Sequence, residues 1–288
     1  MVTAIRMLLL IGFLTAVELR AADAGKRPDG GKTSSSALAA KRRSEVIRPD
    51  ALNVRYGEKR PELTSHDPAS DRLLDVYLPR PPKPETGYPC VMFIHGGGFI
   101  GGSKRSRGRL NSVCVKMLEH GIAVVSINYY LVRKYAKSKT RDKYKEVRVA
   151  AEDAELAMKW IVDHAGEYGF DLERFAVCGS SAGARTCFEL AYVRTPKAPK
   201  IRAVIDLWGM MADPGMIRAG TPPSLIIHGD QDKVNNISHA YAIKRRLDQL
   251  KIPNRMIVMK GRGHSQTGEV SKKYMKDIFE FLHRYWDN

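Results

Sequence analysis

Cysteine is scarce in this sequence, with four in 288 residues and none before Cys90. Cys90, Cys114, Cys178 and Cys187 all lie in apolar contexts inside expected strands or helices. Their spacing matches no disulfide framework and no metal-binding motif. An even count in an exported protein would permit disulfides, but we expect buried free thiols, no metal site and no cofactor. The lack of an early cysteine leaves a lipid-attached N-terminus unsupported.

Acidic residues are also few, since 31 Asp and Glu accompany 48 Lys and Arg for a net charge of +17. The excess is concentrated between Lys104 and Lys145, where twelve basic residues accompany only Glu119 and Asp142, a local charge of +10. A basic surface favours anionic partners, including nucleic acid, anionic lipid and acidic polysaccharide, and acidic polysaccharide is the candidate partner. No nucleic-acid motif accompanies the charge, so we expect no nucleic-acid partner. The alternative is an ordinary solvated charged face.

The N-terminal apolar run, Met7–Val17, is too short for a transmembrane span. Arg6 precedes the run, and Ala22-Asp23-Ala24 follows it as a small-residue cleavage site. This pattern predicts a signal peptide over residues 1–24, and with it a secreted or periplasmic protein without a stable membrane anchor. An uncleaved anchor and an ordinary apolar helix are the alternatives.

Beyond this segment the sequence predicts one α/β domain. Residues 25–49 are rich in Lys, Arg, Gly and Ser and should form a disordered basic linker, so the domain occupies residues 50–288. Strands are expected at Leu73–Leu78, Cys90–Ile94, Ile122–Asn128, Phe175–Cys178, Ala203–Leu207, Leu225–Ile227 and Met256–Met259. Helices are expected at Leu110–Glu119, Val147–Ala165, Ala182–Val193, Ser238–Leu250 and Val270–Trp286. This alternation indicates a mostly parallel sheet with helices on both faces.

The segment Phe175–Gly183 carries the strongest chemical signal. A short apolar run meets a turn that reads Gly-x-Ser-x-Gly, and helix-like sequence comes next. That arrangement exposes one serine, Ser181, at a tight bend where the glycines leave room for a substrate carbonyl. The pattern is weak alone, so its meaning depends on the residues at the ends of the other strands.

Three further pieces lie directly after other expected strands. His95-Gly96-Gly97-Gly98 comes directly after one strand, and glycine backbone N–H groups there, with the N–H of Ala182, can form an oxyanion hole. The turn His228–Asp232 offers two aspartates, Asp230 and Asp232, either of which could orient a histidine or merely form the turn. Glycines precede His264 in the loop after the last strand, and it comes last in the order Ser, Asp, His.

These residues predict acyl transfer through a serine nucleophile. His264 would take the proton of Ser181, and the aspartate would hold the imidazole in the required tautomer. The N–H groups of Gly97, Gly98 and Ala182 would bind the oxyanion, and water would release the acyl group in a second step.

The chain resembles α/β-hydrolases of the esterase and lipase type that carry His-Gly-Gly-Gly, and in particular secreted acetyl-xylan and feruloyl esterase-like carboxylesterases. The likeness runs from about Leu73 to the C-terminus and includes Ser126-Ile127-Asn128-Tyr129. The resemblance implies the α/β-hydrolase fold and Asp232 as the acid. It also implies a small-molecule or oligosaccharide ester as substrate, such as acetylated or feruloylated polysaccharide. The short Pro/Gly-rich interval Pro196–Pro223 leaves no room for a large lid.

Several positions depart from that family's pattern. Ala184-Arg185 follows Ser-Ala-Gly where relatives often have another glycine, and Phe99 stands where many have Trp. Asn235-Asn236 replaces a frequent Val-Pro. Phe99 and Arg185 are therefore the candidate substrate-binding residues, although Arg185 also fits a solvent-facing position.

Two other functions remain open. The first is a serine amide hydrolase, either an arylformamidase or a prolyl-oligopeptidase-like peptidase, because Gly229–Val234 resembles the acid turn of the latter. Such a peptidase normally carries a propeller domain, for which residues 50–288 leave no room. The second is a non-catalytic binding protein on a hydrolase scaffold, against which the complete set of catalytic residue types argues.

Overall fold

The computed structural model describes residues 47–59, 71–80, 82–131 and 143–287. The chain divides into two units, Met1–Glu45 and Val46–Asn288, and every described residue belongs to the second. The expected signal peptide and nearly all of the expected linker lie outside the described residues, so both stay predictions. Among the described helices, none is long and apolar enough to cross a membrane.

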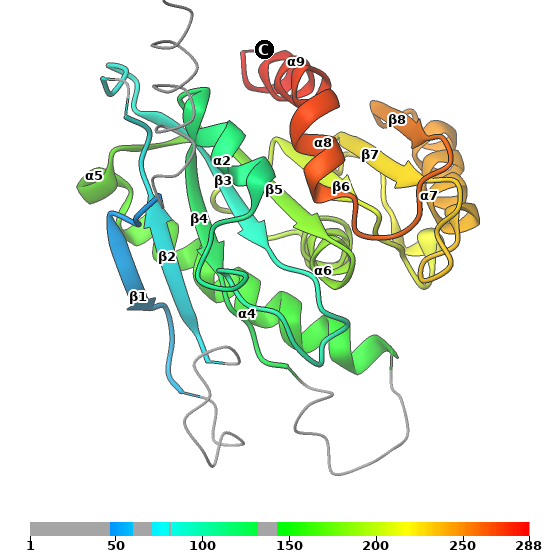
Figure 1. Cartoon of the computed structure of the whole chain (residues 1–288), viewed down its shortest axis with the longest axis horizontal. Helices are drawn as coiled ribbons and strands as arrows, with labels where there is room; N and C mark the ends of the chain where they lie inside the picture. Colours follow the sequence, from blue (N-terminus) through cyan, green and yellow to red (C-terminus); the bar gives the residue numbers. More distant parts are fainter. Residues whose placement is uncertain (1–46, 60–70, 81, 132–142, 288) are drawn as a thin grey trace, which may run out of the picture. The chain divides into compact units, whose positions relative to one another are not determined.

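The second unit is built around an eight-stranded sheet with the order β1-β2-β4-β3-β5-β6-β7-β8 (Figure 1). The strands are β1 (Ala51–Arg55), β2 (Leu73–Tyr77), β3 (Tyr88–Ile94), β4 (Ala123–Ile127), β5 (Phe170–Ser180), β6 (Ala203–Leu207), β7 (Ser224–Gly229) and β8 (Asn254–Met259). The pairs β1–β2 and β2–β4 are antiparallel, and all the other pairs are parallel. The expected mostly parallel sheet is therefore confirmed.

Helices cover both faces of this sheet (Figure 1). The helical segments are α2 (Ser112–Glu119), α4 (Lys143–Asp163), α5 (Ala165–Tyr168), α6 (Ala182–Phe188), η1 (Glu189–Arg194), η2 (Pro214–Met216), α7 (Ile237–Gln249), α8 (Thr267–Lys273) and α9 (Met275–Trp286). Buried side chains of α4, α6 and α7 belong to the core on one face, and those of α2, α8 and α9 belong to the core on the other.

The central strands form the core because both of their faces are covered. Every residue of β2, β3, β4, β6 and β7 is buried, as continuous apolar runs in a parallel sheet predict. The edge strand β1 was not expected from the sequence, since its residues are mostly half-buried or exposed and its pairing with β2 is irregular. Two expected helices are also divided: η1 continues α6 as a π-helix, and Tyr274 separates α8 from α9.

The four cysteines are buried free thiols, as expected. Burial raises the pKa of all four thiols, which keeps them protonated near neutral pH. Since the thiolate is the reactive form, these cysteines are chemically quiet packing residues.

A buried ion cluster anchors the loop that follows the glycine run. The ammonium of Lys104 lies 3.0 Å from Asp75 Oδ1 and donates to Asn53 Oδ1 over 2.6 Å. Arg105 Nε lies 2.9 Å from the other oxygen of Asp75, and the Lys104 amide donates to Asn128 Oδ1 over 2.7 Å. Lys104 is therefore not part of a basic surface, contrary to the reading of residues 104–145 as one exposed basic segment. Residues 132–142 of that segment lie outside the described residues.

Candidate active site

Ser181 occupies a strained turn between β5 and α6. Its φ of +51° is unusual for a residue with a side chain, and its amide donates to Leu207 O on the neighbouring strand over 2.9 Å. The flanking glycines allow the turn, because a Cβ on Gly179 would lie 2.4 Å from the carbonyl carbon of Gly183. A Cβ on Gly183 would lie only 2.0 Å from Ile94 O. The sequence pattern thus reflects close backbone approach between β5, α6 and the end of β3.

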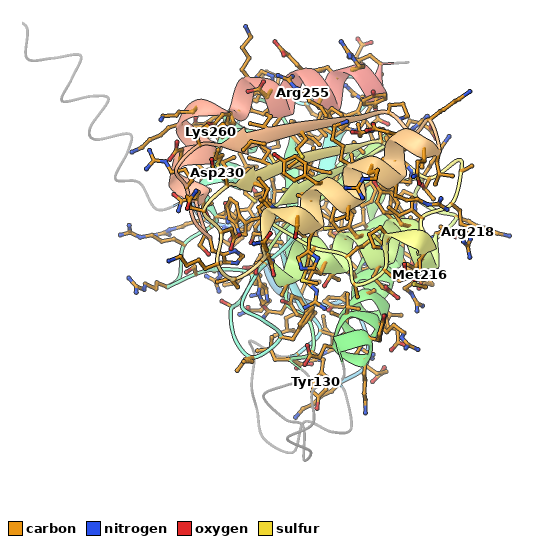
Figure 2. All side chains as sticks on the ribbon, turned by 90° about the vertical axis from the view of Figure 1, so that its right-hand side faces the viewer. Tyr130, Met216, Arg218, Asp230, Arg255 and Lys260 are labelled. Atoms are coloured by element: carbon orange, nitrogen blue, oxygen red, sulfur yellow. The ribbon has the colours of Figure 1, made fainter. Side chains whose placement is uncertain are left out.

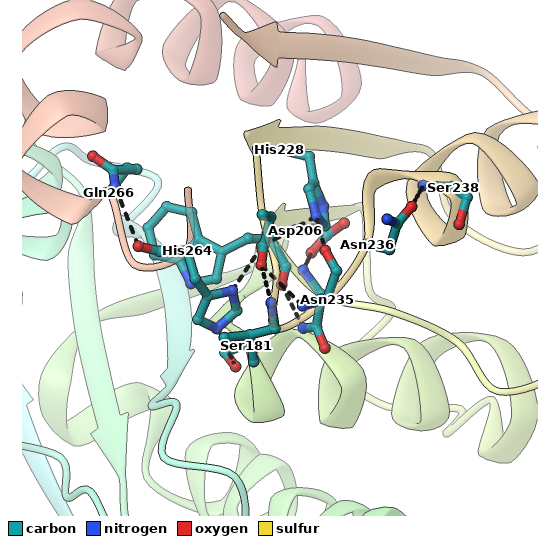
Figure 3. Close-up of polar contacts among 12 residues, drawn as sticks. Ser181, Asp206, His228, Asn235, Asn236, Ser238, His264 and Gln266 are labelled. Atoms are coloured by element: carbon teal, nitrogen blue, oxygen red, sulfur yellow. Dashed lines mark hydrogen bonds and ion pairs between the residues drawn. The ribbon is translucent and has the colours of Figure 1, made fainter. Parts of the chain in front are cut away.

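Three predicted residues, Ser181, His264 and Asp232, form a continuous hydrogen-bonded chain, and Figure 3 labels the first two of them. His264 Nε2 lies 2.8 Å from Ser181 Oγ, and His264 Nδ1 lies 2.7 Å from Asp232 Oδ2. An ionised carboxylate only accepts, so Nδ1 carries the hydrogen and Nε2 is left to accept the serine proton. The three side chains come from the ends of β5, β7 and β8, which parallel pairing places at one edge of the sheet. This arrangement can perform nucleophilic acyl transfer.

The two aspartates of the acid turn, Asp230 and Asp232, make different hydrogen bonds. Asp232 Oδ1 accepts from the amides of Val234 and Asn235 over 2.8 and 2.9 Å, and the carboxylate is buried. Asp230 Oδ1 instead accepts from the amide of Gly261 over 2.7 Å and ties the β7 and β8 loops together. Asp232 is therefore the aspartate that the structure brings to His264.

The glycine loop lies directly against the serine turn. A Cβ on Gly96 would lie 2.9 Å from Ser180 O and 3.3 Å from Ser181 Cβ. Gly97 has a φ of +123°, and a Cβ there would lie 2.0 Å from Gly101 O, so only glycine fits. Ala182 is the first residue of α6, and its amide has no acceptor within that helix. The predicted oxyanion donors thus lie on segments that touch at Ser181.

His95 supports the glycine loop from within the core. Its ring stacks on Tyr129 at 4.4 Å between centroids, and the Tyr129 hydroxyl donates to His95 O over 2.9 Å. Burial lowers the pKa of His95 to about 4, so the imidazole is neutral near pH 7. Its Nδ1 lies 2.6 Å from Gly96 O, an acceptor, which assigns the hydrogen to Nδ1.

The two candidate substrate-binding residues are both largely buried. Phe99 has no exposed surface, and its ring packs edge-on against Tyr129. The guanidinium of Arg185 lies over the same ring, 5.2 Å from its centroid, and Arg185 is 6% exposed. The expectation that Phe99 contacts substrate does not match this burial, and the ring instead supports Arg185. Arg185 lines a small hollow with Tyr144 and Met210, so its contact with substrate stays a prediction.

A cavity of about 460 Å³ adjoins the glycine loop and is lined by His95, Gly96, Ser180 and Arg107, among others. A larger groove of about 800 Å³ lies elsewhere, around Met216 and Arg218. In Figure 2 those two residues lie on the opposite side from Asp230 and Lys260, which follow β7 and β8 near the site. Met216 also lines the small hollow that contains Arg185, so the larger groove and that hollow share a residue. The described residues contain no group of three or more His, Cys, Asp or Glu that could hold a metal ion.

Sequence reasoning assigned no role to three buried polar residues around the site. His228 lies 3.3 Å from Asp232, and Asn235 donates its side-chain amide to Trp208 O over 2.8 Å. Asp206 accepts from the Gly209 amide over 2.6 Å, and burial raises the pKa of Asp206 to about 7. For His228 and Asp206 the available signal was a polar residue within a largely apolar strand, and Asn235 in the following loop carried no such signal.

The structure explains why Asn235-Asn236 stands in place of the Val-Pro that is frequent in the resembling family. A valine at 235 could not make the side-chain bond to Trp208 O. Asn236 caps α7 by accepting from the Ser238 amide over 2.9 Å. Both asparagines therefore fix the acid turn and the start of α7.

Comparisons with known proteins give two family matches. The family described as BD-FAE matches residues 74–212, and the prolyl oligopeptidase family matches residues 212–288. The chain is 29% identical over 150 residues to ethyl acetate hydrolase of Pseudomonas putida, covering 50% of this chain and 42% of that protein. It is 29% identical to esterase LipI of Mycobacterium tuberculosis over 42% of this chain and 34% of the relative. The chain thus spans less than half the length of these curated relatives.

Solved structures share the fold at lower identity. A truncated carbohydrate esterase from gut microbiota aligns with a TM-score of 0.65 and 17% identity, covering 85% of this chain and 99% of that one. Esterase 2 of Thermogutta terrifontis phosphorylated by paraoxon aligns with a TM-score of 0.64 and 19% identity. The alignment covers 82% of this chain and 94% of that one. Together with the sheet order, these likenesses establish the α/β-hydrolase fold.

Proposed function

We propose that this chain, an α/β-hydrolase with a His-Gly-Gly-Gly loop, is a serine carboxylic-ester hydrolase. The observation that carries the proposal is the hydrogen-bonded chain from Ser181 Oγ through His264 to Asp232, with links of 2.8 and 2.7 Å. Similarity to ethyl acetate hydrolase and to esterase LipI supports ester hydrolysis as the reaction.

The geometry supports an acyl-enzyme mechanism in two steps. Ser181 Oγ forms a bond to the acyl carbon while its proton passes to His264 Nε2, and the carbonyl electrons move to oxygen. The amides of Gly97, Gly98 and Ala182 stabilise that oxyanion, each such donor contributing about 2.7–4 kcal/mol. The intermediate collapses, and the alcohol leaves with the proton from His264. Water then gives a proton to His264 and attacks the acyl carbon; as the bond to Ser181 Oγ breaks, His264 returns that proton to Ser181 Oγ and the acid leaves.

The substrate we propose is an acetylated or feruloylated polysaccharide outside the cytoplasm. Similarity to a carbohydrate esterase supports a carbohydrate ester, and the N-terminal sequence supports export. Apart from strand β6, the Pro196–Pro223 interval contains only the short η2, which supports a site open to large substrates. Arg107 and Arg109 are exposed, and Arg107 also lines the cavity beside the glycine loop, where it could attract acidic sugar.

Amide hydrolysis is the second candidate function. It is favoured by the match of residues 212–288 to the prolyl oligopeptidase family, since this region carries both Asp232 and His264.

A substrate panel tests the proposed function. Acetyl, feruloyl and longer acyl esters, free and on oligosaccharides, are compared with amides that have the same acyl groups. We expect turnover of the acetyl and feruloyl esters, with kcat/KM falling for long acyl chains. Amide turnover with negligible ester turnover would instead support the second candidate.

A further inference from the structure

Two imidazole nitrogens lie close to one oxygen of the Asp232 carboxylate. Asp232 Oδ2 lies 2.7 Å from His264 Nδ1 and 3.3 Å from His228 Nε2 (Figure 3). His228 is fully buried at the carboxyl end of β7, and its Nε2 also lies 2.8 Å from Asn235 O. The bond to Asn235 O thus holds the buried His228 imidazole beside Asp232.

The surroundings of His228 define its tautomer. Asn235 O can only accept a hydrogen bond, so His228 Nε2 carries the hydrogen. Its Nδ1 is buried without a hydrogen-bond partner among the described residues, which also favours an unprotonated Nδ1. Burial is the main cause that lowers the pKa of His228, so the ring is a neutral donor. Its Nε2–H therefore bonds to Asn235 O, while Asp232 Oδ2 lies 3.3 Å from the same nitrogen.

We propose that His228 is a positioning residue that sets the basicity of His264 through the shared oxygen of Asp232. The positive end of an N–H dipole 3.3 Å from a carboxylate oxygen offsets part of its negative charge, and the carboxylate then stabilises the His264 imidazolium less strongly. Without that N–H, Asp232 binds the protonated His264 more tightly and the pKa of His264 rises. This inference rests on the proposed function, because it assigns His264 as the base.

Few other charges act on this pair of histidines. The titratable groups that influence His228 are Asp232 on the β7 turn, His264 on the β8 loop and His239 on α7. His264 itself faces Ser181, Asp232 and the edge of the Trp208 ring, which carries no charge. A change in the pH profile after substitution of His228 therefore reports on Asp232 and His264.

Two substitutions of equal polarity test the proposal. In His228→Gln the side-chain amide reaches the position of Nε2 and can still place an N–H beside Asp232 Oδ2. In His228→Asn the shorter side chain reaches only the position of Nδ1, so the N–H beside Asp232 is lost. The measurement is kcat/KM for p-nitrophenyl acetate against pH, with the thermal unfolding midpoint as the control for folding.

Only neutral His264 acts as base, so the acid limb of the profile marks its pKa. We expect the acid limb of His228→Asn to move to higher pH by roughly half a unit or more, and that of His228→Gln to stay near the wild type. A folded His228→Asn variant with an unchanged acid limb would overturn the proposal, even if its kcat were lower at every pH.

An NMR titration of the ring nitrogens separates this proposal from the proposed function. If the wild type hydrolyses no ester, the proposed function fails, and the pKa of His264 can still be compared between wild type and His228→Asn. If neither variant folds, the wild-type spectrum decides: a hydrogen on His228 Nε2 supports the proposal, and a hydrogen on Nδ1 overturns it.

Discussion

Replacement of Ser181 with alanine is expected to lower kcat/KM for p-nitrophenyl acetate by a factor of about 10⁴ or more. The loss is large because Ser181 Oγ is the only atom of the hydrogen-bonded chain that can form the acyl bond. The pair of His264 and Asp232 would remain, but His264 would have no serine hydroxyl from which to take a proton. Initial rates over a range of substrate concentrations measure the effect.

The adjacent serine provides a matched control. Ser180 is the last residue of β5 and lines the cavity beside the glycine loop, and it has no place in the catalytic chain. We expect Ser180→Ala to keep most of the activity, and both variants to unfold near the wild-type temperature. Retained turnover in a folded Ser181→Ala variant would remove Ser181 as the nucleophile.

Replacement of Asp232 with asparagine should lower kcat/KM by a factor of about 10³–10⁴. Asparagine Oδ1 can keep both backbone hydrogen bonds, from Val234 and Asn235, so the turn should be preserved. Its NH₂ group then takes the place of Oδ2, where it faces the N–H of His264. Two donors repel, and His264 turns to the tautomer that cannot accept the proton of Ser181.

Asp230→Asn is the control for this second prediction. Asp230 accepts one backbone hydrogen bond, from Gly261, which asparagine Oδ1 can also accept. We expect Asp230→Asn to retain nearly full kcat/KM. Equal losses in the two variants would mean that the acid turn acts through its conformation and not through a carboxylate at Asp232.

Local sequence signals predicted most of the strands and the positions of the main site residues. Buried parallel strands are continuous apolar runs, so β3, β6 and β7 were visible without knowledge of their partners. Their carboxyl ends meet at one edge, which is why Ser181, Asp232 and His264 could be connected from their order in the chain. The edge strand β1 was missed because only Tyr56 just beyond it, and no residue within it, is buried.

What the sequence did not reveal depends on side chains that meet from distant segments. The burial of Phe99 follows from its packing against Tyr129 and Arg185, and neither contact leaves a periodic pattern. In the sequence, Lys104 is one basic residue among many, and only the structure shows its ion pair with Asp75 on β2. His264 bonds to Asp232 Oδ2 and His228 lies 3.3 Å from the same oxygen, although the two histidines are 36 positions apart in the sequence; only the fold brings them together.

Covalent labelling by paraoxon tests most directly whether His264 activates Ser181 for acyl transfer. The reagent places a diethylphosphoryl group on an activated serine, and mass spectrometry of the intact protein and its peptides locates that group. We predict one group per chain, on Ser181, with labelling lost in Ser181→Ala and strongly slowed in His264→Ala. A folded wild-type protein that stays unlabelled, or that is labelled at another residue, would contradict the account.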